Sequence, residues 1–321
     1  MPGRGRRHGR HCKDGPPRPV VLFGEAVLDA APSGTTPGGA PFNVACHLGR
    51  LGLRARLLTR VGADEGGREI LRAIRACGLP GSGIQVDPHR RTARVRVRGG
   101  AGGPAFEIPP RRAFDAIDPR AAAAAFSRAR PGLLYFGTLA QRAEPSRSAL
   151  AALLSRRAAD TFTFLDVNLR APWWNVRTLA RSLEAATTVK ANEEELVAIA
   201  AALRLRGSGT RGRAEALLAA FPCSRLVVTR GASGAVLFTR RGRALTARSA
   251  PGHPLPGPAR DSVGAGDAFS AAFLAGLLLG WPAATTLDRA NRLGAALCTV
   301  RGARPASDAF YGPFRRAWGL A

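Results

Sequence analysis

The feature that most limits the fold is a repeated alternation of short apolar runs with longer amphipathic stretches. The apolar runs have strand length, and continuous hydrophobicity is typical of strands buried on both faces of a parallel sheet. We expect such strands at Val20–Gly24, Leu133–Gly137, Phe162–Asp166, Thr187–Lys190 and Leu226–Thr229. We expect helices at Asn43–Leu51, Gly67–Cys77, Ser146–Ala159, Trp174–Ala185, Glu193–Arg204, Arg213–Ala220, Asp267–Leu279 and Ala283–Val300. The pattern predicts a doubly wound α/β fold, with a mainly parallel sheet flanked by helices and ligands at the carboxyl ends of its strands.

One stretch departs from this rhythm. Residues Thr92–Arg98 alternate polar and apolar side chains, and a Gly-rich turn then leads to Ala105–Ile108. Alternation with period two predicts a half-exposed β-hairpin, within about residues 84–112. Two interpretations are open: a small lid over a ligand site, or an edge hairpin that only packs against the body.

The formal charge of +26 raises the question of nucleic-acid binding, because clustered Lys and Arg side chains neutralise phosphates. Lysine occurs only at Lys13 and Lys190, and the arginines are scattered rather than arranged in a stripe with interleaved aromatics. We therefore attribute the charge to compositional bias and expect no specific nucleic-acid recognition. The longest apolar run, Ala268–Trp281, is shorter than the roughly 20 residues that span a bilayer, so we expect no membrane partner.

The first 19 residues differ from the rest of the chain. They carry Arg4, Arg6, Arg7, Arg10, Lys13 and Arg18, without an apolar run. We expect a disordered basic tail over residues 1–19 and a single domain over 20–321. The tail lacks the apolar centre of a secretory signal, and the five cysteines are odd in number and widely spaced, so we expect a reducing cytoplasm.

Several familiar motifs are absent or misleading. Gly207–Gly212 satisfies G-x-G-x-x-G, but it follows a predicted helix rather than a strand, so we interpret it as a flexible loop. Neither lysine stands in a Walker A setting, and the histidines show no metal-ligand spacing.

The heptapeptide Asp261–Asp267, D-S-V-G-A-G-D, places glycines and an acid where an apolar helix begins. Glycines at a helix start let backbone N–H groups approach an anion closely. A bound phosphate would repel Asp267, so the acid beside an anion cradle suggests a base that faces the hydroxyl attacking that phosphate. The alternative is an ordinary capped helix.

The heptapeptide resembles the second signature, D-T-x-G-A-G-D, of the ribokinase-like sugar kinases, also called the phosphofructokinase-B family. The first signature is visible in Gly38–Ala45, and the resemblance covers nearly the whole chain after residue 19. Further matching segments are Gly24–Asp29, Asp166–Arg170 with Trp173 and Trp174, Asn192–Glu195, Val228–Gly231 and Arg301–Ala303. The resemblance implies a ribokinase-like fold in which the hairpin belongs to a small lid over the sugar and can form a homodimer surface.

The resemblance also implies roles for single residues in phosphoryl transfer. Asp267 would accept the proton of the sugar hydroxyl, as a carboxylate of ordinary pKa near 4. The backbone amides of Gly264, Ala265 and Gly266 would form an anion hole for the moving phosphoryl group. Asn192 and Glu195 match the N-x-x-E motif, in which Glu195 organises Mg²⁺ through water; the alternative is a capping box at a helix start. Thr229 and Gly231 would contact the phosphates of ATP, and Asn291 would border the adenine.

Sugar recognition needs buried polar groups that match several hydroxyls. The family positions that supply them correspond to Asp29, Gly39 and Asn43, with a turn cap and a helix cap as the structural alternatives for the two side chains. Arg170 resembles the cation of the D-x-N-x-R segment of fructokinases and 2-keto-3-deoxygluconate kinases. Arg94, on the expected lid, is a further candidate for contact with the substrate.

Two departures from the family pattern affect the expectations. Ser262 replaces the usual threonine and keeps its hydroxyl. Residues 251–260 are rich in proline and lack the usual apolar-acid lead-in, which argues against the monovalent-cation loop of many relatives.

Together these features predict an ATP-dependent sugar kinase that uses Mg²⁺, with fructose as the leading substrate. Alternatives within the family are kinases for 2-keto-3-deoxygluconate, another ketose or a nucleoside. A catalytically idle, sugar-binding regulator is the alternative from a different class.

Overall fold

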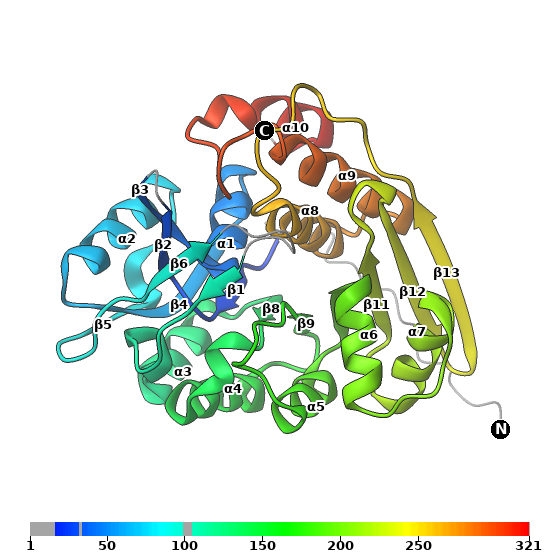
Figure 1. Cartoon of the computed structure of the whole chain (residues 1–321), viewed down its shortest axis with the longest axis horizontal. Coiled ribbons are helices and arrows are strands. Elements are labelled where there is room, and N and C mark those ends of the chain that lie inside the picture. Colours follow the sequence, from blue (N-terminus) through cyan, green and yellow to red (C-terminus); the bar gives the residue numbers. More distant parts are fainter. Residues whose placement is uncertain (1–16, 32–33, 99–104, 321) are drawn as a thin grey trace.

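The computed structural model describes residues 17–31, 34–98 and 105–320. In this part of the chain a nine-stranded sheet runs through the centre, in the order β13-β12-β11-β10-β9-β8-β1-β4-β5 (Figure 1). The strands β5, β4, β1, β8, β9, β10 and β11 are parallel, and β12 pairs antiparallel with β11 and β13. Their bounds are β1 Val20–Phe23, β4 Ala55–Gly62, β5 Ile84–Asp87, β8 Leu133–Phe136, β9 Phe162–Asp166, β10 Thr188–Asn192, β11 Arg225–Thr229, β12 Ala235–Arg241 and β13 Ala244–Ala250.

Helices cover both faces of this sheet, one layer above it and one below it in Figure 1. The first layer contains α1 Ala40–Arg50, α2 Glu65–Ala76, α8 Ala265–Leu279, α9 Ala283–Leu297 and α10 Gly312–Trp318. The second contains α3 Pro119–Ala129, α4 Glu144–Arg156, α5 Val176–Ala185, α6 Glu193–Ala202 and α7 Gly209–Ala220. In β1 the side chains of Val20 and Leu22 enter the first core, and those of Val21 and Phe23 enter the second. The predicted doubly wound α/β fold is confirmed.

A second, four-stranded sheet lies beside the first layer, in the order β3-β2-β6-β7. Its strands are β2 Val27–Ala31, β3 Gly34–Gly38, β6 Arg94–Arg98 and β7 Ala105–Glu107. The predicted hairpin, β6 and β7, is present and antiparallel, whereas its pairing with β2 was not predicted. We call this sheet the lid; its inner face carries Val27, Asp29 and Val95, which line the pocket described below.

The structure corrects several sequence expectations. The predicted range of about 84–112 contains both hairpin strands of the lid, but it also contains strand β5, which belongs to the edge of the large sheet. The predicted loop at Gly207–Gly212 is wrong from Gly209 onward, because α7 begins there. The basic tail lies outside the described residues up to residue 16, but Arg18 belongs to the folded body. Its guanidinium donates to the carbonyl oxygens of Arg130 and Pro131 and to Asp160.

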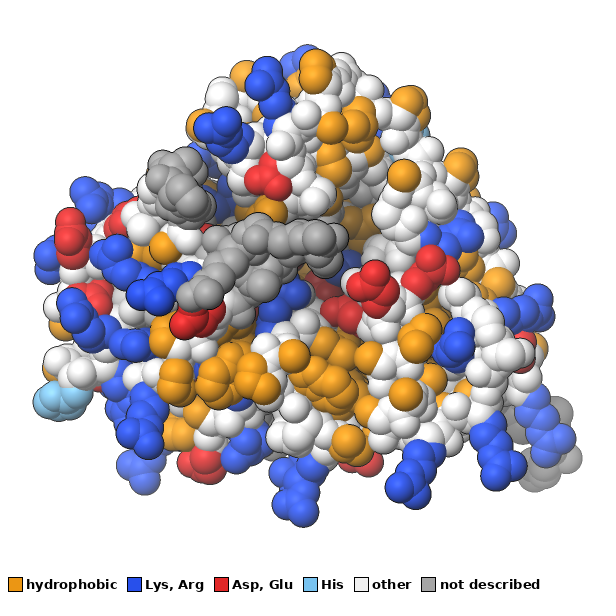
Figure 2. All heavy atoms as spheres, in the orientation of Figure 1, with side chains coloured by type: hydrophobic (Ala, Val, Ile, Leu, Met, Phe, Trp, Pro, Cys, Tyr) orange, Lys and Arg blue, Asp and Glu red, His pale blue; other side chains and the backbone are white. Residues whose placement is uncertain are grey.

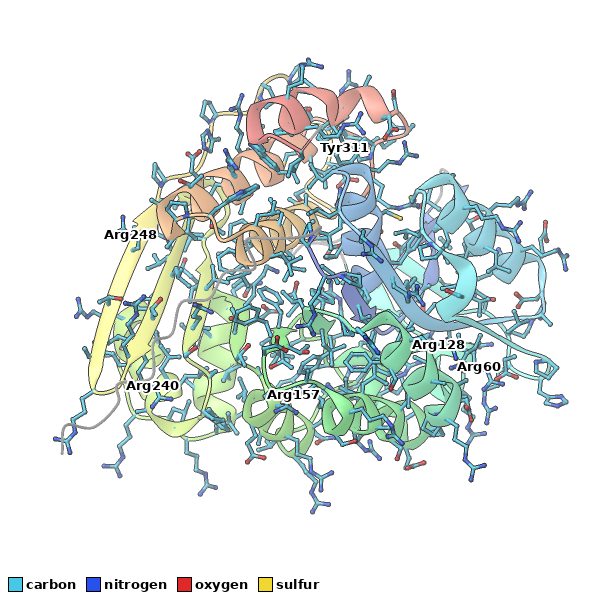
Figure 3. The ribbon with its side chains drawn as sticks, turned by 180° about the vertical axis from the view of Figure 1, so that it is seen from behind. Arg60, Arg128, Arg157, Arg240, Arg248 and Tyr311 are labelled. Carbon is cyan, nitrogen blue, oxygen red and sulfur yellow. The ribbon has the colours of Figure 1, made fainter. Side chains whose placement is uncertain are left out.

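The arginines are dispersed over the surface rather than gathered in one stripe. Figure 3 labels Arg128, Arg157, Arg240 and Arg248, which come from α3, the end of α4, β12 and β13 and lie far apart on the rear face. Within the described residues no helix is both long and apolar enough to cross a bilayer.

Candidate active site

A pocket of about 450 Å³ opens where the carboxyl ends of the central strands meet the start of α8 and the inner face of the lid. The space-filling view shows the hollowed centre of this face with acidic side chains gathered beside it (Figure 2). Most of the predicted site residues line this one pocket: Asp29, Gly39, Asn43, Arg170, Asn192, Glu195, Thr229, Gly264, Gly266 and Asp267. The fold therefore brings the two signature segments and the intervening motifs to one place.

Asp267 lies in the first turn of α8, on the pocket wall. Its Oδ2 accepts a 2.8 Å hydrogen bond from Nδ2 of Asn43, a residue of α1. The pKa of Asp267 is raised to about 7, because burial and the charge of nearby Asp166 together outweigh the lowering by the Asn43 hydrogen bond, Lys190 and Arg170. This value differs from the expected ordinary pKa near 4, because the surrounding protein shields the half-buried carboxyl from much of the solvent. A group that titrates near neutrality suits proton transfer.

The start of α8 has the geometry of an anion cradle. Gly264 caps the helix at φ +81°, and a Cβ there would lie 2.5 Å from Cα of Ala303, so the position requires glycine. The first hydrogen bond of α8 runs from the amide of Ala268 to the carbonyl oxygen of Gly264. The amides of Gly266 and Asp267 come before it, so they have no partner within the helix. The amide of Ala265 already donates to the carbonyl of Ser262, at 3.2 Å. The amide of Ala265 is therefore less available to an anion than the sequence predicted. Gly264 and Gly266 are the main residues of the cradle geometry.

Lys190 is a site residue that the sequence reasoning missed. Its Nζ lies 2.9 and 3.0 Å from the two carboxylate oxygens of Asp166, which is its cross-strand partner between β9 and β10. A Cβ on Gly266 would stand 3.6 Å from this Nζ, so the ammonium group lies beside the cradle. Asp166 also accepts hydrogen bonds from Tyr135 and Ser270, which satisfies a charge that would otherwise be costly to bury. The isolated lysine in an arginine-rich chain was the available signal.

The end of the pocket next to the lid is rich in carboxylates. Burial raises the pKa of Asp29 to about 6 and that of Glu25 to about 7, while the charge of Arg170 lowers both. Glu25 was not among the predicted residues, although one of its carboxylate oxygens, Oε2, is buried without a hydrogen-bond partner. Gly39 begins α1 at φ +102°, and a Cβ there would lie 2.7 Å from the carbonyl oxygen of Glu25.

A third missed residue, Arg304, supports this end of the pocket from outside. Its Nη2 donates to the carbonyl oxygen of Pro37 in β3 at 2.7 Å, and its guanidinium lies 4.5 Å above the ring of Phe42. The charge of Arg304 also lowers the pKa of Asp29. Arg304 therefore ties the base of the lid to α1, and it directly follows the matching segment Arg301–Ala303.

Asn192 and Glu195 form the capping box that the sequence allowed. The amide of Glu195 donates to Oδ1 of Asn192 at 2.7 Å, and the amide of Asn192 donates to Oε2 of Glu195 at 2.9 Å. Oε1 of Glu195 accepts from the amide of Leu169, which fixes the segment before Arg170. Within the described residues there is no cluster of three or more acidic, His or Cys side chains that could enclose a metal ion. A carboxylate and an amide oxygen at the pocket rim fit a Mg²⁺ that keeps most of its water.

Three further predicted residues, Gly231, Asn291 and Arg94, do not line the pocket. Thr229 lines the pocket at the end of β11, but Gly231 is exposed beyond it at φ +54° and is not part of the lining. Asn291 is buried in α9, where its Nδ2 donates to the carbonyl oxygens of Ala250 and Pro251, so the structure gives it a role in packing. Arg94 is on the outer face of the lid, because alternation along β6 turns Val95 inward. The prediction that Arg94 reaches the sugar from this position is therefore wrong.

Known proteins resemble this chain in sequence and in fold. A family profile described as "pfkB family carbohydrate kinase" matches residues 18–309. The fructokinase of Salmonella typhimurium is 32% identical over 311 residues, which covers 89% of this chain and 95% of that protein. A fructokinase double mutant of Vibrio cholerae O395, solved with fructose, ADP and potassium ion, superposes with a TM-score of 0.77 at 27% identity and covers 93% of this chain and 99% of its own. A sugar kinase of Pyrococcus horikoshii in complex with ATP superposes at 0.75 with 25% identity, over 88% of this chain and 93% of its own.

The profile spans most of the chain and includes every segment that builds the pocket. The chain belongs to the pfkB family of carbohydrate kinases. It is a sugar kinase.

Proposed function

We propose that the protein transfers the γ-phosphoryl group of ATP to a hydroxyl of fructose. The observation that carries this proposal is the position of Asp267, a carboxyl of raised pKa at the glycine-rich start of α8 inside a pocket bounded by the lid. The fructokinases among its relatives, and the neighbours solved with fructose, ADP or ATP, support it.

The charge of the pocket favours a neutral polyol. The charge of Arg170 lowers the pKa of Glu25, Asp29 and Asp267, and Lys190 is paired with Asp166, so both cations lie near carboxylates of the protein. An acid such as 2-keto-3-deoxygluconate would add a further negative charge to this set. The hydroxyl groups of a sugar instead donate hydrogen bonds, which the carboxylates of Asp29 and Glu25 can accept.

In the proposed reaction Asp267 accepts the proton of the attacking hydroxyl while Asn43 holds its carboxylate in place. The amide of Gly266 and the ammonium of Lys190 stabilise the charge on the phosphoryl group in transfer. Asn192 and Glu195 would hold a hydrated Mg²⁺ beside the phosphates, where the ion would neutralise their charge. Thr229 would contact the nucleotide phosphates. A monovalent cation has no part in the proposal, since residues 251–260 contain no acid.

Two other functions remain alternatives. Within the family, the protein would phosphorylate 2-keto-3-deoxygluconate, another ketose or a nucleoside. As an idle regulator, it would bind sugar without turnover; the complete set of Asp267, Gly264 and Gly266 argues against this. A homodimer through the lid belongs to the same proposal, and sedimentation velocity would test it.

The test is ADP release from Mg²⁺-ATP with fructose, 2-keto-3-deoxygluconate, ribose, other hexoses and nucleosides. Fructose should give the highest kcat/KM, and the Asp267→Asn variant should be nearly inactive with every acceptor. A nucleoside or ribose turned over far better than fructose would refute the substrate assignment. Binding of ATP and sugar without ADP release would support the regulator.

A further inference from the structure

A second pocket, of about 520 Å³, lies on the outer face of the lid, between β6 and the start of α2. We call it the outer pocket. Four guanidinium groups line it: Arg91, Arg94, Arg96 and Arg112. Figure 2 shows Lys and Arg side chains over the part of the molecule where Figure 1 places α2, β6 and β7.

Three carboxylates also line the outer pocket, but two of them are engaged. Asp64 caps α2 by accepting from the amide of Gly67, and it also accepts from the amide and hydroxyl of Thr92. Glu107 lies 3.9 Å from Arg96 across the β6–β7 pair. The third, Glu65, is exposed in the first turn of α2. The carboxylates therefore leave much of the arginine charge unmatched.

The other three arginines lack ionic partners. Within the described residues, Arg91, Arg94 and Arg112 form no ion pair, although Arg91 lies near enough to lower the pKa of Asp64. Nε of Arg112 is buried and has no hydrogen-bond partner. That nitrogen is closed off from the hollow, but the guanidinium groups of Arg91, Arg94 and Arg112 line it without an ionic partner in the described part of the chain, which suits a ligand with acceptor oxygens.

We propose that the outer pocket binds a small phosphorylated anion, held by Arg91, Arg94 and Arg112. Guanidinium groups bind phosphate oxygens in paired, charge-assisted hydrogen bonds, and the hollow is large enough for a phosphate monoester or a diphosphate. A concave site of this size fits a small molecule better than a nucleic-acid strand, which would need a longer charged track.

Binding there would affect the lid. Arg94 stands on β6, whereas Arg112 follows the lid strands and begins the turn at Ala113–Ala116, so one anion would join the lid to the body. The neighbouring residue Val95 lines the sugar pocket from the inner face of the same strand. The occupied outer pocket would hold the lid in place and lower KM for the sugar. This consequence rests on the proposed function, whereas the binding itself does not.

The test is calorimetric titration of the full chain with pyrophosphate as the probe. The double variant Arg94→Gln/Arg112→Gln should weaken one binding component by about tenfold or more, because it removes two charge-assisted contacts. The matched control is a double variant at exposed surface positions, Arg248→Gln/Arg243→Gln, which removes the same charge from β13 and the preceding turn. Equal isotherms for both variants would overturn the proposal. Circular dichroism confirms folding, and the single variant Arg91→Gln provides an independent check.

Further titrations distinguish the possible kinds of ligand. Orthophosphate and a hexose phosphate are titrated in the same way, and tighter binding of the hexose phosphate would assign the site to an organic phosphate. Loss of oligonucleotide binding in the outer-pocket variant, with unchanged pyrophosphate binding, would overturn the proposal in favour of a nucleic-acid surface. Because the readout is binding, it remains informative even if the kinase proves to act on another sugar.

Discussion

Asn43 and Asp267 stand 224 positions apart in the chain, and the side-chain amide of the first donates a 2.8 Å hydrogen bond to the carboxylate of the second. The contact joins α1 to α8 where the two signature segments begin their helices. Each segment alone has an ordinary explanation as a helix start. Together they place the carboxylate of Asp267 on the pocket wall and fix its orientation.

The first prediction concerns the rate of phosphoryl transfer. Asp267→Asn should lower kcat by about 10²- to 10⁴-fold, because an amide cannot accept the hydroxyl proton. In the unmodified protein kcat/KM should rise as pH increases through about 7, since only the ionised carboxylate is a base. The measurement is ADP release from pH 5.5 to 9. A flat profile over this range, with chemistry shown to limit the rate, would contradict the assigned base.

A second prediction follows from the same raised pKa. The folded state keeps the proton of Asp267 at pH values where the unfolded chain has lost it, so this group makes stability fall as pH rises from about 4 to 7. At pH 8 the free energy of unfolding of Asp267→Asn should therefore exceed that of the unmodified protein by about 1–3 kcal/mol. The difference should disappear near pH 4. Denaturant unfolding at both pH values checks this. If the variant were less stable than the unmodified protein at pH 8, the raised pKa of Asp267 would be contradicted.

The sequence predicted the layered fold because it depends on local patterns, and the resemblance of its motifs to a known family implied most members of the pocket. Buried strands are continuous apolar runs, and the signature glycines mark helix starts. It could not predict that Lys190 pairs with Asp166, because that contact depends on the register of β9 and β10. Nor could it predict that Arg94 lies on the outer face of the lid. Alternation separates the two faces of a strand, but it does not show which face lines the pocket. Arg304 was not predicted for a similar reason, because only tertiary packing brings it to the lid.

The third prediction compares two glycines of the anion cradle. Gly264→Ala should destabilise the fold by about 1–3 kcal/mol, because φ is +81° and the new methyl would overlap Ala303. Gly266→Ala should leave stability unchanged or raise it by up to about 1 kcal/mol, because alanine is the better helix former and its Cβ meets only Lys190 Nζ, at 3.6 Å. That methyl would nevertheless occupy the space beside the transferred phosphoryl group, so kcat should fall. Full activity in Gly266→Ala would remove this position from the proposed cradle.

The fourth prediction concerns a buried pair that braces α1 against the C-terminal segment. Nδ1 of His47 lies 2.8 Å from the hydroxyl of Tyr311, labelled in Figure 3, and Nε2 lies 3.1 Å from the carbonyl oxygen of Ala303. Only Nε2–H can donate to that carbonyl, so Nδ1 accepts from Tyr311 in the neutral imidazole. Burial lowers the pKa of His47 to about 3, so the pair loses stability as pH falls below about 6.5, where the unfolded histidine takes up a proton.

Tyr311→Phe should cost about 1–3 kcal/mol at pH 8, because it leaves Nδ1 of the buried imidazole without a donor. The double variant His47→Leu/Tyr311→Phe should cost less than the sum of its two single variants, since it replaces both polar partners together. Chemical denaturation of the three variants measures the coupling. Additive costs would show that the hydroxyl and the imidazole do not stabilise one another.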